Sequence, residues 1–182
     1  GTGGHPKFML KIGEAVAGVE SMLRGEKHRS KLLQVLAFGT YLFGIPRMTI
    51  MNGEKRKRTV KDWLSRDYVQ VDKYMADPMY DYTFTVKGYK TLFKTLEFIQ
   101  DEDNLANVPK NMPVLFISGS KDPVGHYGLD VKLLYNKYSR HITDDVKCIL
   151  YKDARHEVIN EINNIQAYYD IYNWIDLHTI GV

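Results

Sequence analysis

Two short stretches hold the side chains best suited to chemistry, and they are well separated along the chain. One is KDPVG, residues 121–125, which contains Asp122, and the other is ARHEV, residues 154–158, which contains His156. An aspartate beside a histidine orients the imidazole, fixes its tautomer and stabilises the imidazolium that forms when the ring takes a proton. Such a pair would serve as a general base if a nucleophile lay next to it.

The elements around these stretches predict that the two residues meet. MPVLFIS, residues 112–118, and VKCILY, residues 146–151, are apolar runs of strand length, typical of strands buried on both faces. Helices are expected at about 128–138 and 160–177, so the order predicts a right-handed parallel βαβ unit. Because loops at the carboxyl ends of parallel strands share one edge of the sheet, we expect Asp122 and His156 to lie close together there.

The first half of the chain has a different pattern. Residues 6–100 are predicted to be almost entirely helical, with Gly25 as a stop signal and with helix caps at Ser30, Thr59, Asp67 and Thr85. VKDWLS, residues 60–65, and YVQVDKYMA, residues 68–76, are expected to be short helices. The basic run EKRKR, residues 54–58, is interpreted as a solvated turn between two helices.

Composition limits the class of protein. The chain has 182 residues, of which 44% are hydrophobic, so it can form one domain with a real core, with or without a small appendage. A formal charge of +3 gives no argument for a nucleic-acid partner. No apolar run approaches the roughly 20 residues of a membrane span, and the start of the chain lacks the layout of a signal peptide. The lone Cys148, expected to be buried, excludes an intrachain disulfide and favours a cytoplasmic location.

His156 has three possible roles. HEVIN, residues 156–160, nearly matches the zinc motif H-E-x-x-H, but Asn160 stands where the second histidine ligand should be. His126 and His141 offer no ligand spacing either, so we expect no metal and no other cofactor. A solvent-facing histidine near a helix start remains an alternative to the general base.

A general base needs a nucleophile, and the sequence contains no G-x-S-x-G elbow to supply one. Ser118 and Ser120 fall in the loop with Asp122, and neither has a glycine two residues away on each side. The other serines lie in helical or helix-end contexts. In hydrolases that use this elbow, the order along the chain is serine, acid, histidine, so the nucleophile is expected before Gly1.

The chain resembles the C-terminal part of an α/β-hydrolase of the lysophospholipase and monoacylglycerol-lipase type, a group also described as serine aminopeptidase-like. PVLFISGSKDPVGHYGLDVKLLYNKY is similar to that group's penultimate strand, acid loop and next helix, and LYKDARHEVINEINNIQAYYDIYNWI is similar to its last strand, histidine loop and final helix. DWLSRDYVQVDKYMADP resembles part of its cap. GTGGHP resembles the end of the strand before the cap.

The resemblance implies three regions and two site residues. Residues 1–5 would be the end of a core strand and its loop, residues 6–100 a helical cap or lid, and residues 101–182 the C-terminal segment of the α/β core. Asp122 would be the acid of a catalytic triad and His156 its base. The nucleophile and the oxyanion-hole loop have no counterpart among the 182 residues.

The implied activity is acyl transfer by a serine-dependent ester hydrolase whose substrate is a small lipid-like ester. The helical half would then cover an acyl pocket with apolar side chains, or these side chains are simply the cap core: Met9, Met22, Leu36, Phe38, Tyr41, Phe43 and Met48. Two alternatives remain, a proline-type serine aminopeptidase of the same fold and an inactive fragment or binding module. Arg66 and Asp67 could pair with each other or contact substrate, and Asp67 could equally cap a helix.

The expected sheet has an uncovered edge. Two or three parallel strands would leave apolar surface and backbone groups without partners on one side. We therefore expect as partner either the N-terminal half of the same hydrolase or a second copy of the chain that associates through that edge.

Overall fold

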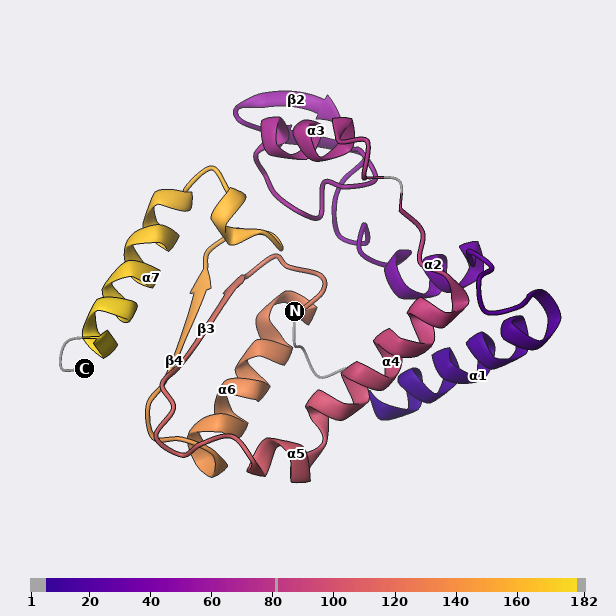
Figure 1. Cartoon of the computed structure of the whole chain (residues 1–182). Coiled ribbons are helices and arrows are strands. Elements are labelled where there is room, and N and C mark those ends of the chain that lie inside the picture. The colour runs from indigo at the N-terminus through magenta and orange to yellow at the C-terminus, as the bar shows by residue number, and fades with distance from the viewer. Residues whose placement is uncertain (1–5, 81, 180–182) are drawn as a thin grey trace.

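The structure of the protein is a computed structural model that describes residues 6–80 and 82–179, so the expectation for residues 1–5 lies outside the described residues. Figure 1 shows two regions, a parallel sheet flanked by helices and a helical part, residues 6–106, that leads into it through α5 (Glu102–Ala106).

The sheet region has the predicted βαβ order. β3 (Val114–Gly119) pairs in parallel with β4 (Val146–Tyr151), in a register that places Val114 opposite Val146. The short helix η1 (His126–Gly128) and α6 (Leu129–His141) connect the two strands, and η2 (Val158–Asn160) and α7 (Asn164–Thr179) follow β4. The prediction of a parallel unit is therefore confirmed, and the second strand has the predicted bounds.

The helices α6 and α7 cover opposite faces of the sheet (Figure 1). Phe116 of β3 packs edge-on against Tyr138 of α6, with ring centroids 5.2 Å apart. Ile117 and Ile149 point the other way and pack against a cluster that includes Ala167 of α7. Cys148 lies in mid-strand as expected, but it is half-buried rather than fully buried, because α6 leaves part of that face open.

Among residues 6–80 and 82–179 this sheet contains two strands, and β3 has no strand partner on the edge away from β4. An edge of this kind presents unpaired backbone groups. The expected partner for that edge remains a proposal.

The core of the helical part lies between three helices, α1 (Lys7–Arg24), α2 (Lys31–Phe38) and α4 (Val86–Gln100). Its buried residues are Leu10, Ala17, Leu33, Val86, Tyr89 and Phe93. Gly13 lets the ring of Phe93 approach α1 closely, because a Cβ at Gly13 would lie 2.8 Å from that ring. Much of the apolar sequence of α1 is exposed instead, including Met22 and Leu23.

Most of the predicted helix caps are confirmed. The side chain of Ser30 accepts a hydrogen bond from the N–H of Leu33, that of Asp67 from Val69, and that of Thr85 from Gly88. Gly25 ends α1 with a φ of 82°, a conformation that favours glycine.

The basic run EKRKR was predicted to be a solvated turn, and this prediction is wrong. β1 (Met48–Met51) and β2 (Glu54–Lys57) form an antiparallel hairpin, so the first half is not almost entirely helical. Asn52 and Gly53 make its two-residue turn, with φ values of 51° and 82°. Arg56 is held by both carboxylate oxygens of Asp72 on α3 (Tyr68–Ala76), at 2.8 and 3.0 Å.

The helix predicted at residues 60–65 is also absent, because residues 60–63 form a turn. The carboxylate of Asp62 accepts hydrogen bonds from the N–H and hydroxyl of Thr59, so Thr59 caps no helix there. The carbonyls of Asp62 and Ser65 accept from Arg155, far along the chain, instead of from the next helical turn. Contacts with the sheet region thus set the conformation of this segment.

Candidate active site

Two loops leave the carboxyl ends of the strands and lie against each other. The aspartate loop, residues 120–125, follows β3, and the histidine loop, residues 152–157, follows β4. The N–H of Lys121 donates to the carbonyl of Ala154 at 2.8 Å, and the N–H of Asp153 donates to the hydroxyl of Ser120 at 2.8 Å. A Cβ on Gly119 would overlap the carbonyl oxygens of Ala154 and Arg155, so glycine is what permits this contact.

The structure brings Asp122 and His156 together, as the sequence predicted. Both carboxylate oxygens of Asp122 lie 3.1 Å from Nδ1 of His156. A carboxylate only accepts hydrogen bonds, so Nδ1 carries the hydrogen and Nε2 of the neutral ring is left as an acceptor. The Asp122 side chain is 5% exposed and that of His156 is 25% exposed, which leaves part of the imidazole accessible.

The surroundings of Asp122 favour its ionised form. Burial alone would raise the pKa of this carboxyl, but the hydrogen bond and charge of His156, together with the N–H of Val124 at 2.9 Å, hold its pKa below the ordinary value. Ser118 also donates to Asp122, at 3.4 Å. An ionised aspartate in this position can orient the imidazole and stabilise it when protonated.

A segment of the helical part lies against His156, and sequence reasoning did not identify it. The contact segment, residues 62–66, brings the ring of Trp63 to 5.2 Å from the imidazole, centroid to centroid. The carbonyl of Trp63 accepts from the N–H of His156 at 3.3 Å, and that of Leu64 accepts from the N–H of Glu157 at 2.8 Å. No local pattern in the sequence predicts these contacts, because they join positions about 90 residues apart.

Charged groups hold the contact segment in place. Arg66 donates to the buried carboxylate of Glu161 at 2.8 Å and does not pair with Asp67, which caps α3 as one of the sequence alternatives predicted. Arg155 reaches the contact segment from the histidine loop. Sequence reasoning missed both Arg155 and Glu161.

An apolar groove of about 160 Å³ lies between α1, α2 and α4. Of the apolar residues proposed for an acyl pocket, Met9, Leu36, Phe38 and Tyr41 line it, whereas Met22, Phe43 and Met48 are exposed and do not. An aromatic path leads from the groove toward His156: the rings of Phe38 and Tyr41 are 5.7 Å apart, and those of Tyr41 and Trp63 are 5.0 Å apart. Burial and the nearby charge of Asp122 raise the pKa of Tyr41.

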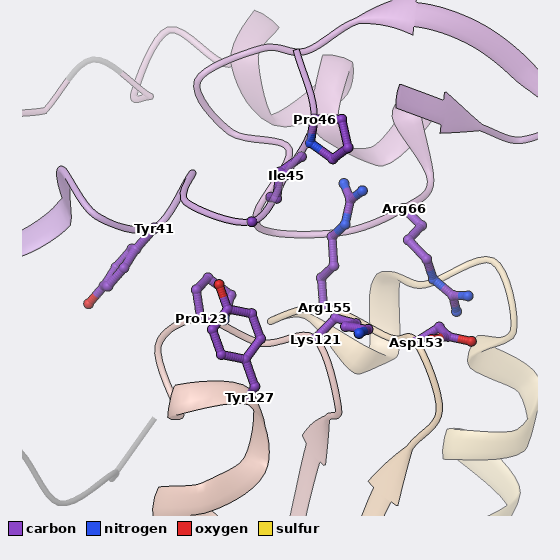
Figure 2. Close-up of a pocket in the computed structure, with 10 residues that line it drawn as sticks. Tyr41, Ile45, Pro46, Arg66, Lys121, Pro123, Tyr127, Asp153 and Arg155 are labelled. Atoms are coloured by element: carbon purple, nitrogen blue, oxygen red, sulfur yellow. The ribbon is translucent and has the colours of Figure 1, made fainter. Parts of the chain in front are cut away.

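A second pocket, of about 240 Å³, lies where the aspartate and histidine loops meet the helical part (Figure 2). It is lined by Tyr41, Ile45 and Tyr127 on one side and by Arg66, Asp153 and Arg155 on the other. Neither Asp122 nor His156 lines it, although their chain neighbours Lys121, Pro123 and Arg155 do.

Serine hydroxyls and the Cys148 thiol are the side chains that could serve as a nucleophile. Within the described ranges, no serine hydroxyl hydrogen-bonds to the imidazole: Ser118 donates to Asp122, and Ser120 accepts from Asp153. Burial raises the pKa of the Cys148 thiol, which disfavours the reactive thiolate.

A metal site is not formed by the residues that the structure describes. No group of three or more histidine, cysteine, aspartate or glutamate side chains gathers there, and Asn160 donates to Glu157 at 2.9 Å instead of facing His156. His126 makes a separate pair with Asp130 at 2.5 Å. No helix within residues 6–80 and 82–179 has the length and apolar character needed to cross a bilayer.

The fold is that of the α/β-hydrolases, as comparison with solved structures shows. A carboxyl esterase from Bacillus coagulans superposes with a TM-score of 0.73 at 22% identity, over 99% of this chain and 55% of the esterase. A monoglyceride lipase from Saccharomyces cerevisiae superposes with a TM-score of 0.59 at 16% identity, over 94% of this chain and 48% of the lipase. A monoacylglycerol lipase from Paleococcus ferrophilus superposes with a TM-score of 0.57 at 17% identity, over 92% of this chain and 65% of the lipase.

The family profile described as serine aminopeptidase, S33, matches residues 11–163, and the chain belongs to this family. The resemblance seen in the sequence is thereby confirmed at the level of the α/β-hydrolase group. The chain spans about half the length of the first solved structures that it matches. No curated protein sequence matches it.

Proposed function

We propose that the protein is a serine-dependent ester hydrolase in which Asp122 is the triad acid and His156 the general base. The observation that carries this proposal is the pair of 3.1 Å contacts between the Asp122 carboxylate and Nδ1 of His156, at the carboxyl edge of a parallel sheet. In this geometry Nε2 is the atom available to take a proton from a hydroxyl nucleophile.

We place the nucleophilic serine in a segment that precedes residue 1, together with the rest of the sheet. This part of the proposal is supported by the absence of a serine beside His156 among the described residues and by the roughly twofold greater length of the similar structures. The serine would attack an ester carbonyl and transfer its proton to His156. His156 would return that proton to the leaving alcohol, and water would hydrolyse the acyl-enzyme.

The substrate class that we propose is a monoester with an apolar acyl chain. The groove between α1, α2 and α4 is lined largely by apolar side chains, and Phe38, Tyr41 and Trp63 connect it to His156. Apolar chains gain free energy on leaving water for such a groove. We further propose residues 6–100 as the cap and residues 101–182 as the core segment, so that α5 (Glu102–Ala106) is the connection at the start of the core segment.

A fluorophosphonate probe, which reacts with activated serines, tests this proposal. We expect labelling of a protein that includes the preceding segment and none of residues 1–182 alone. Labelling of residues 1–182 alone would contradict our placement of the nucleophile. Turnover of a short-chain acyl ester against a proline amide then separates the esterase from the aminopeptidase, and we expect the ester to be preferred.

A further inference from the structure

A buried polar network joins the contact segment to the histidine loop without using any side-chain atom of Asp122 or His156. Its centre is Glu161, which is 2% exposed. The carboxylate of Glu161 accepts from the N–H of Arg155 at 2.7 Å, and from the N–H and Nε–H of Arg66 at 3.2 and 2.8 Å. Every oxygen of this buried carboxylate therefore has a donor.

Arg155 connects the histidine loop to the contact segment in the opposite direction, from its own side chain to backbone carbonyls of that segment. This side chain, 8% exposed, donates from Nη1 to the carbonyls of Asp62 and Ser65, and the hydroxyl of Ser65 donates to the carbonyl of Asn160 at 2.8 Å. Figure 2 shows Arg155 extending from the histidine loop toward the helical part while Arg66 extends in the opposite direction. Glu161 and Arg155 are buried charges, and burying a charge is costly unless it is hydrogen-bonded, so these bonds favour one arrangement of the contact segment against the histidine loop.

This arrangement determines the surroundings of His156. With the contact segment held, the carbonyls of Trp63 and Leu64 accept from the N–H groups of His156 and Glu157, and the Trp63 ring lies beside the imidazole. The imidazole is thus bounded by Asp122 at Nδ1 and by Trp63 on one side. Fixing an imidazole in one orientation and one tautomer is what a general base requires.

We propose that Arg66, Arg155 and Glu161 are positioning residues that clamp the contact segment onto the histidine loop and thereby hold the His156 imidazole in its Asp122-bonded orientation. The catalytic meaning of this clamp rests on the proposed function, whereas its structural effect does not. If the helical part moved, the contacts of Trp63 and Leu64 with His156 and Glu157 would break. The clamp therefore links the position of the helical part to the orientation of the His156 imidazole.

Two measurements on the 182-residue chain test the clamp. Glu161→Gln keeps the shape of the side chain but removes the ion pair with Arg66, and Arg66→Met removes the same pair from a side chain that is 22% exposed. We expect hydrogen exchange of the His156 and Glu157 amides to become roughly tenfold faster or more, with exchange in the β3–β4 ladder unchanged. We also expect the imidazole ¹⁵N spectrum of His156 to change from one tautomer to a mixture.

Asp72→Asn is the matched control, because it breaks a two-bond ion pair with Arg56 within the helical part. It should leave both readouts unchanged. If Glu161→Gln does not fold, Arg66→Met decides the question. Unchanged exchange and an unchanged imidazole spectrum in the clamp variants would overturn the proposal. Neither readout requires turnover, so failure of the proposed ester hydrolysis would be seen separately.

Discussion

Asp122 and His156 lie 34 positions apart, yet both oxygens of the aspartate are 3.1 Å from Nδ1 of the histidine. The parallel pairing of β3 and β4 produces this contact, because it sends both following loops to one edge of the sheet. Burial of Asp122, partial exposure of His156 and the proposed clamp from the helical part all fit the proton transfer that we propose for this pair.

The close approach of the two loops depends on Gly119. We expect Gly119→Ala to lower the free energy of unfolding by about 3 kcal/mol or more, because its Cβ would overlap the carbonyls of Ala154 and Arg155. Urea denaturation measures this loss. Gly18→Ala is the control: nothing lies within 4 Å of a Cβ there, and alanine should stabilise α1 by roughly 0.5–1 kcal/mol. Equal effects of the two changes would contradict the close contact.

Stability at acid pH should report on Asp122. Its pKa is lowered in the folded chain, so the unfolded chain binds more protons below the ordinary value of about 3.9. This contribution to the free energy of unfolding is present above that value and is lost as the pH falls through the folded pKa. We expect Asp122→Asn to be less stable than the parent chain at pH ~7 and to show a shallower decline toward pH ~2 in urea titrations. Parallel declines would argue against a stabilised carboxylate.

The apolar groove should select acyl length. In the protein that includes the preceding segment, we expect Met9→Trp, at a groove-lining residue that is 52% exposed, to lower kcat/KM for long acyl esters by roughly tenfold. Short esters should be spared, because the larger ring occupies only the space that a few methylenes of a long chain need. Met22→Trp lies on the same helix but outside the groove, and it should have no effect on either substrate. Loss of activity toward short and long esters alike would contradict this role of the groove.

The sequence predicted the sheet region well because the signals there are local. VKCILY is a strand of the predicted bounds, and the order of strands and helices determines that Asp122 and His156 share an edge. The hairpin at residues 48–57 was missed although Asn52-Gly53, a strong two-residue hairpin signal, stands between its strands. This turn dipeptide could have revealed it, whereas MTIM shows no apolar–polar alternation and the strand buries Thr49 while it exposes Ile50.

Other features could not be predicted because the contacts that create them are distant in sequence. Val60 to Ser65 has a helix-compatible sequence, but Arg155 takes the carbonyls that a helix would use. The roles of Trp63 and Glu161 likewise depend on how the helical part packs on the histidine loop. Neither residue belongs to a local motif that would single it out.

The most direct test of the central claim is the rate of ester hydrolysis by the protein that includes the preceding segment, with His156→Gln compared against His126→Gln. His126 also pairs with an aspartate, Asp130, and its side chain is 54% exposed, so it is a matched control. We predict that His156→Gln lowers kcat by roughly 10³- to 10⁴-fold with little change in KM, while His126→Gln retains the parent rate. A His156→Gln enzyme with kcat within about tenfold of the parent would contradict the assignment of His156 as the general base.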